Sequence, residues 1–198
     1  CGAVNNFKES VEKLEEYYKT YNNYNELISY RLGFHAEYTT KREILEGISE
    51  LAQKYKAPVF THSRKTKSEV EGCIERYGKT PTELFEELGL WNYGGGGYHS
   101  VWLSDNDMQI YKKRGLWAVI NAGSNAKLAS GIADVQKMSN LGLNLAVGTD
   151  GPSSNNALDM FREMYLAAVT QKLKTSDAAA CDAAELLKSA TVGGAHCM

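Results

Sequence analysis

Five short apolar stretches alternate with longer amphipathic stretches along the chain. Each apolar stretch is followed by polar or turn-forming residues, which is typical of buried strands in a parallel sheet. The strands that this pattern predicts are 27–34, 59–61, 98–103, 116–120 and 143–147. Between them, apolar residues recur every three or four positions, which predicts helices that cross from one strand to the next. We therefore expect an α/β fold with a parallel sheet and crossover helices.

Polar residues mark the expected ends of the helices. A Ser, Thr or Asn followed three positions later by an acid can satisfy the free amides of a helix's first turn. Such pairs are Asn6 with Glu9, Thr40 with Glu43, Thr66 with Glu69, Thr80 with Glu83 and Ser104 with Asp107. Towards the C-terminus we expect a turn-rich loop over 121–125, a helix over 132–141, a long helix over 157–172 capped from 153–156, and a last helix from 176 or 177 to 188.

Length and composition exclude several classes of protein. A chain of 198 residues, 43% of them hydrophobic, is long enough for one domain with a sizeable core. The net charge of -2 predicts neither a nucleic-acid partner nor a membrane partner. No apolar run approaches the roughly 20 residues that span a bilayer, and no signal peptide is visible. The four cysteines are scattered without C-x-x-C pairs, which favours a reducing, cytoplasmic setting over disulfides or a thiolate zinc site.

Residues able to bind a metal ion stand at or near the ends of four predicted strands: His35, His62, His99 and Asp150. Since the carboxyl ends of parallel strands meet at one edge of a sheet, we expect these side chains to lie together. Neutral imidazole and carboxylate are ligands that suit zinc, and a catalytic zinc site keeps one position for water. Two simpler interpretations are that Asp150 only binds turn amides and that the histidines are satisfied by backbone groups.

Five sequence blocks resemble, in order, the second half of the metal-dependent amidohydrolases. The blocks lie at 33–39, 61–70, 98–103, 123–133 and 148–156. The most specific pair is Ser-Asn-x-Lys-Leu-Ala-Ser-Gly together with Gly-Thr-Asp-Gly. In these motifs the chain is most similar to the deaminases of S-adenosylhomocysteine and 5′-methylthioadenosine, which are related to chlorohydrolases and guanine deaminase.

The resemblance implies a TIM (β/α)8 barrel and the hydrolytic deamination of an aminopurine nucleoside by hydroxide bound to one zinc ion, with iron or manganese as alternative metals. By the same resemblance, His62 and Asp150 would be metal ligands. Asp150 would also take a proton from the attacking water, and His99 would polarise the substrate or hold that water. His35, Lys65 and Asp150 are expected to contact the substrate.

Two departures from the family pattern stand out. The chain has no His-x-His motif, which supplies two zinc ligands in the family, and five strand–helix units cannot close a barrel of eight. We therefore expect residues 1–198 to form a single amidohydrolase-type barrel domain that is incomplete at both ends, a partial barrel of about the last five units. Lys65 stands where the resemblance places a glutamate, and a lysine could act as a base there only as a neutral amine.

These departures leave alternatives to a deaminase open. One is a catalytically silent homologue that binds a ligand or a partner protein. Another is a chlorohydrolase-like hydrolase whose substrate has a good leaving group, for which the missing glutamate matters less. In each case the expected ligand is a small molecule. We expect the isolated chain to be inactive and to associate, either with further copies of itself or with a missing N-terminal half.

Overall fold

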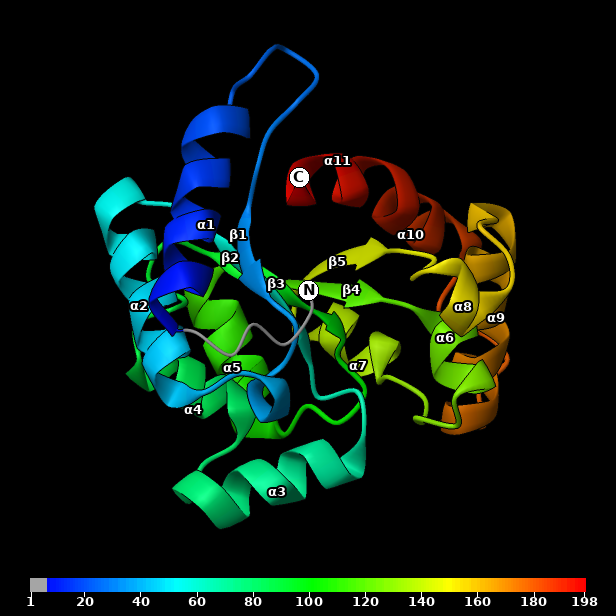
Figure 1. Cartoon of the computed structure of the whole chain (residues 1–198). Helices are drawn as coiled ribbons and strands as arrows, with labels where there is room; N and C mark the ends of the chain where they lie inside the picture. The colour runs from blue at the N-terminus through cyan, green and yellow to red at the C-terminus, as the bar shows by residue number, and fades with distance from the viewer. Residues whose placement is uncertain (1–6) are drawn as a thin grey trace.

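A five-stranded parallel sheet forms the centre of the fold (Figure 1). The computed structural model describes residues 7–198. The strands are β1 (Leu32–Phe34), β2 (Val59–Ser63), β3 (Gly95–His99), β4 (Trp117–Ile120) and β5 (Asn144–Val147). Each strand pairs in parallel with the next one along the chain, so the order in the sheet is β1-β2-β3-β4-β5. The predicted α/β fold with a parallel sheet is confirmed.

Helices precede and connect the strands. Before and after β1 lie α1 (Phe7–Tyr21), the short 3-10 helix η1 (Glu37–Thr39) and α2 (Arg42–Tyr55). The next connections contain α3 (Lys67–Tyr77), α4 (Pro81–Glu87), α5 (Asp105–Arg114), α6 (Ala122–Lys127) and α7 (Val135–Asn140). After β5 follow α8 (Pro152–Asn155), α9 (Met160–Thr175), α10 (Ala183–Lys188), the π-helix η2 (Ser189–Gly193) and α11 (Gly194–Cys197). None of the helices within residues 7–198 is both long and apolar enough to cross a membrane.

The two faces of the sheet have different cores, because successive side chains of a strand point to opposite faces. Val59, Ala118 and Leu145 belong to the main core, which also contains buried residues of α2, α4, α5 and α7. On the other face, Phe60 and Val119 belong to a second, smaller cluster with Ala146 and Cys197. The helices of the chain therefore cover mainly one face, and the C-terminal segment contributes to the other.

Three of the predicted helix caps are confirmed. Thr66 and Thr80 each accept a hydrogen bond from the backbone of the acid three positions later, and so does Ser104. Thr40 is not a cap, because α2 begins one residue later, after Lys41, without a side-chain cap. The predicted cap at Asn6 lies outside the described residues.

The predicted strands at 27–34 and 98–103 are wrong in their bounds. Residues before Leu32 form turns instead, held by bonds such as that from the Leu27 amide to Asn25. The third strand begins in the glycine run, at Gly95, and ends at His99. Its first residues are glycines because the neighbouring backbone lies too close for side chains. A Cβ on Gly95 would lie 1.9 Å from the carbonyl oxygen of Val59.

Four predictions for the C-terminal part were also inexact. Residues 122–127 form α6 rather than a loop, and the amide of Gly123 in its first turn is satisfied by Glu163, a partner distant in sequence. The helix predicted over 132–141 is confined to α7. Residues 152–155 form the separate helix α8, and the long helix α9 is capped by Asp159. The last predicted helix begins only after its cap, Asp182.

Candidate active site

The four residues singled out from the sequence lie at one edge of the sheet. His35 follows β1, His62 lies in β2, His99 ends β3 and Asp150 follows β5 by three positions. The parallel register aligns these strand ends, since Ser63 of β2 pairs with His99 of β3. Their predicted placement at the C-terminal edge is therefore confirmed, whereas their chemical roles stay predictions.

Three imidazole rings form a row along this edge. The ring centroids of His35 and His62 are 4.9 Å apart, and those of His62 and His99 are 5.4 Å apart in a stacked arrangement. His62 Nδ1 lies 2.8 Å from the carbonyl oxygen of His35. Since a carbonyl can only accept, Nδ1 of His62 carries a proton, which in the neutral ring leaves the lone pair on Nε2. His35 Nδ1 lies 2.9 Å from the hydroxyl of Thr39.

His99 is fully buried and neutral at physiological pH. Burial, helped by the charge of Lys65, lowers its pKa to about 4. Its backbone amide donates to Oδ1 of Asn121, and its Nδ1 lies 2.9 Å from Oδ1 of Asn125. The proton therefore lies on Nδ1, and Nε2 has no hydrogen-bond partner within the described part of the chain. Nε2, which carries the lone pair, lies 3.9 Å from Oδ2 of Asp150.

Asp150 is held as a carboxylate. Partial burial raises its pKa, but hydrogen bonds from the Ser124 hydroxyl and the Gly151 amide, with the nearby charge of Lys65, outweigh burial and leave the pKa below its usual value. The Ser124 hydroxyl is 2.6 Å from Oδ2, and the Gly151 amide is 2.7 Å from Oδ1. Lys65 Nζ lies 3.7 Å from Oδ2. Asp150 therefore does bind a turn amide, as the simpler interpretation held. It also faces Lys65 and His99. The edge of the sheet that carries these residues with His35 and His62 is called the rim.

Asn121 and Asn125 also belong to the site, although neither was predicted as a site residue. The side chain of Asn121, just after β4, accepts from the His99 amide at 3.1 Å and donates to the Gly148 carbonyl at 2.9 Å. It thus joins the ends of β3 and β5 across β4. Its place after a strand end was the available signal, since the histidines and Asp150 hold the equivalent places on the other strands.

A buried carboxylate supports the Asp150 loop from behind. Glu163 of α9 is fully buried and accepts from the Gly123 amide at 2.9 Å and from Asn155 Nδ2 at 2.6 Å. Asn155 also donates to the carbonyl of Thr149 at 2.7 Å. These bonds connect the loop after β5 with the start of α6, which carries Ser124.

A second buried support lies under Lys65. The carboxylate of Glu69 accepts from the amides of Arg64 and Lys65, each at 2.9 Å. The guanidinium of Arg64 is fully buried, forms an ion pair with Asp107 and donates to the Trp102 carbonyl at 3.0 Å. The turn that places Lys65 is therefore fixed to both α3 and α5.

The described residues do not fit a metal ion by themselves. Nε2 of His62 and the carboxylate of Asp150 are two suitable donors, and a protein site for zinc uses three or four. Within residues 7–198, no group of three or more His, Cys, Asp or Glu side chains is placed to hold a metal. The ammonium of Lys65, rather than a further acid, lies beside Asp150.

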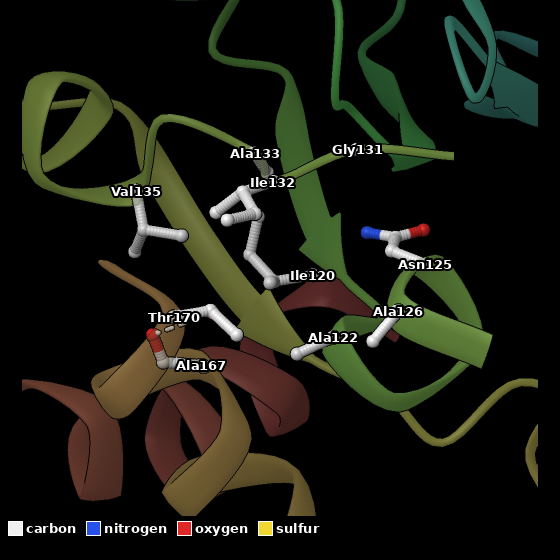
Figure 2. A pocket seen from close by; sticks show the side chains of 10 residues that line it. All are labelled: Ile120, Ala122, Asn125, Ala126, Gly131, Ile132, Ala133, Val135, Ala167 and Thr170. Atoms are coloured by element: carbon white, nitrogen blue, oxygen red, sulfur yellow. Dashed lines mark hydrogen bonds between the residues drawn. The ribbon is translucent and has the colours of Figure 1, made fainter. Parts of the chain in front are cut away.

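A small cavity lies behind β4, away from the row of histidines. Its volume is about 20 Å³, enough for about one water molecule. Figure 2 shows the side chains of Ile120, Ala122 and Val135 around it, with Asn125 at its border. A larger hollow of about 220 Å³ is lined by residues just before the strands, among them Pro58 and Gly115, so it belongs to the opposite end of the sheet. Neither is at the rim.

Comparisons with known proteins agree with this arrangement. The model of the amidohydrolase family matches residues 2–198. A 5-methylthioadenosine/S-adenosylhomocysteine deaminase of Caldanaerobacter subterraneus subsp. tengcongensis is 40% identical over 195 residues, which cover 96% of this chain and 45% of the relative. A 5′-deoxyadenosine deaminase of Methanopyrus kandleri is 36% identical over 96% of this chain and 44% of its own length. The chain thus spans less than half the length of these relatives.

Solved structures give the same result. An adenosine deaminase from Xanthomonas campestris with bound zinc superposes with a TM-score of 0.89 at 34% identity, over 96% of this chain and 43% of that one. A guanine deaminase from C. acetobutylicum superposes with a TM-score of 0.90 at 23% identity, over 96% of this chain and 47% of that one, which shows the shared fold. The predicted partial barrel is confirmed, and this chain belongs to the amidohydrolase family.

Proposed function

We propose that this chain is part of an amidohydrolase whose reaction is the hydrolytic deamination of an aminopurine nucleoside of the S-adenosylhomocysteine or methylthioadenosine type. The observation that carries the proposal is the convergence of His62, His99 and Asp150 at one edge, with two imidazole lone pairs and a carboxylate available for chemistry. The names of the relatives at 36–40% identity support the substrate class.

The geometry supports distinct roles for the rim residues. Asp150 has a lowered pKa, so it is ionised and able to accept a proton from an attacking water. With its proton on Nδ1, His99 presents Nε2 as an acceptor, which favours holding that water over polarising a substrate carbonyl or ring nitrogen. His35 and Lys65 stand at the same rim, where they would contact the substrate.

We propose that the complete protein uses one divalent metal ion, zinc in the first place, with His62 and Asp150 as two of its ligands. The hydrogen bond from His62 Nδ1 to a carbonyl supports this, because metal-binding histidines usually fix their second nitrogen in this way. The Xanthomonas campestris relative was solved with bound zinc. The remaining ligands would come from outside this chain. When bound, the metal would supply Lewis acidity and a lowered pKa of water.

The same reasoning extends to the domain and its setting. We propose that residues 1–198 are an incomplete barrel domain, completed by an N-terminal half or by another copy, because the five described strands leave the outer edges of β1 and β5 without a paired strand. A reducing, cytoplasmic setting is supported by the free cysteines Cys73, Cys181 and Cys197, which are all buried.

One observation favours a second candidate, a catalytically silent homologue that binds a ligand or a partner. Lys65, which stands where the resemblance places a glutamate, is paired with Asp150, the residue proposed as the base.

A chimaera separates the two candidates. The unmatched N-terminal part of the Caldanaerobacter deaminase is fused to this chain, supplied with zinc, and assayed for ammonia release from S-adenosylhomocysteine, methylthioadenosine and adenosine. We expect slow turnover with Lys65, faster turnover after Lys65→Glu, and none after Asp150→Asn. A folded, zinc-loaded chimaera without turnover in either of the first two forms would favour the silent homologue.

A further inference from the structure

We propose that the ammonium of Lys65 takes the place of a cation at Asp150 in this chain, so that a metal ion bound here, even with further ligands from outside the chain, is held more weakly than it would be beside an uncharged side chain. The inference concerns the site of the proposed function and rests on the same residues. Its basis is the 3.7 Å distance between Lys65 Nζ and Asp150 Oδ2. Both side chains are mostly buried, with 22% and 18% of their surface exposed, so water screens the pair less than it would at an open surface.

The position of Lys65 is built into the fold. Its amide is held by Glu69, and the preceding residue, Arg64, is fixed by a buried ion pair with Asp107. Arg64 also has a φ of 58°, an uncommon conformation for a residue with a side chain, which turns the chain sharply after β2. The backbone of Lys65 is therefore constrained, and its side chain reaches the carboxylate of Asp150.

The nearby carboxylate of Glu69 is already bound to the amides of Arg64 and Lys65, so it does not offer a second position for a cation. The neighbouring rings are His35, His62 and His99, and His62 donates Nδ1–H to the carbonyl of His35. Ser124 and the Gly151 amide already donate to the carboxylate of Asp150. A divalent ion bound to Asp150 would lie within a few ångströms of the ammonium, and like charges at that distance repel strongly in a partly buried site.

The test measures metal affinity rather than activity. The 198-residue chain is titrated with Zn²⁺ by calorimetry and with Co²⁺ by visible absorption, up to millimolar metal. Lys65→Met removes the charge and keeps the length of the side chain, Lys65→Arg keeps the charge, and Lys65→Met combined with Asp150→Asn removes the carboxylate as well. Far-UV circular dichroism confirms that each variant is folded.

We expect Lys65→Met to bind zinc about tenfold more tightly or better, which corresponds to about 1.4 kcal/mol. Lys65→Arg should bind like the wild type, and the double variant should lose the gain. Equal affinities of the wild type and Lys65→Met, or no zinc binding by Lys65→Met up to millimolar metal, would overturn the inference. So would a gain that persists in the double variant, because the metal would then bind elsewhere. An inactive chimaera would not affect these outcomes.

Discussion

The Nε2 atom of His99 faces Oδ2 of Asp150 at 3.9 Å, although the two residues belong to β3 and to the loop after β5, with β4 between them. The gap is too long for a hydrogen bond and leaves space near a lone pair and a carboxylate. Neighbouring side chains hold each group from behind: Asn125 orients the imidazole, and Ser124 orients the carboxylate. Both supports come from α6, so this short helix sets the geometry of the pair.

Replacing Asn125 should change which ring nitrogen of His99 carries the proton. Asn125→Ala removes the acceptor of Nδ1–H, so the proton should redistribute between Nδ1 and Nε2, which nitrogen-15 NMR of the ring measures. We also expect a loss of about 1–3 kcal/mol in the free energy of unfolding, because Nδ1–H is left buried without an acceptor. Asn125→Asp, which keeps an acceptor oxygen, is the control. An unchanged tautomer in Asn125→Ala would show that the ring is oriented by other contacts.

Glu163 should be important for the stability of the Asp150 loop. In Glu163→Ala, the buried Gly123 amide loses its acceptor and the Asn155 side chain loses one of its two acceptors, which should lower the free energy of unfolding by about 1–3 kcal/mol. Glu163→Gln keeps one acceptor oxygen and should cost less. Urea denaturation followed by circular dichroism gives both values, and equal losses in the two variants would contradict the assigned bonds.

Gly97 should tolerate a methyl group only after Tyr111 is shortened. A Cβ at this position would lie 2.2 Å from the Tyr111 hydroxyl and 2.9 Å from Cβ of Ser63, so Gly97→Ala should destabilise the fold by about 1–3 kcal/mol, most of it from the closer contact with Tyr111. Tyr111→Phe alone should be close to neutral, because the hydroxyl is buried without a hydrogen-bond partner among the described residues. The double variant should recover much of the loss. Simple addition of the two single effects in thermal unfolding would argue against this contact.

The three buried thiols should resist alkylation until the pH is high. Burial raises the pKa of Cys73 to about 12 and those of Cys181 and Cys197 to about 11. Iodoacetamide at pH 8.5, read out residue by residue by mass spectrometry, should leave them unmodified in the folded chain and modify them in urea, because the thiolate is the reactive form.

The same raised pKa values predict how stability depends on pH. The unfolded chain loses these thiol protons near pH 9, whereas the folded chain keeps them, so the free energy of unfolding should fall as the pH rises from about 9 to about 11. Below that window both states are protonated and the thiols have no effect. Replacing Cys73, Cys181 and Cys197 with Ala should flatten this part of the stability curve.

A proline at position 122, beside the cavity behind β4, should stabilise the chain. Ala122 lines this cavity (Figure 2) and is the first residue of α6, a position that suits proline. We expect Ala122→Pro to raise the free energy of unfolding by about 0.4–1 kcal/mol, mostly by restricting the unfolded chain. Ala126→Pro, which breaks the interior of the same helix, is the control and should be destabilising. A loss of stability in Ala122→Pro would mean that the backbone of Asn121 cannot adapt to the following proline.

The sheet was predictable because its strands are apolar runs followed by polar residues. The third strand was the exception: Gly95, Gly96 and Gly97 have no side chains, so no alternation of polar and apolar positions marks them. Helix α6 was missed because its residues are common in turns and one of its first amides is satisfied by Glu163, forty positions away. Only the folded chain brings these groups together.

Only part of the candidate site was predictable from the sequence. His35, His62, His99 and Asp150 were identified because imidazoles and acids are uncommon at strand ends and conspicuous there. Asn121 was not, because asparagine is frequent in turns and its function depends on two strands that it does not belong to. The contact between Lys65 and Asp150 also required the structure, since the sequence shows only that a lysine stands at position 65.

Arg64, His99 and Asp150 all adopt positive φ angles, of 58°, 73° and 58°. Such a conformation costs a residue with a Cβ roughly 1–2 kcal/mol and is almost free for glycine. Glycine would relieve this strain, but at position 64 it would also leave Asp107 buried without its ion-pair partner. At the rim, the molecule therefore spends folding energy to hold these side chains in place. Glycines at the three positions would remove the backbone strain together with the side chains whose contacts make the rim.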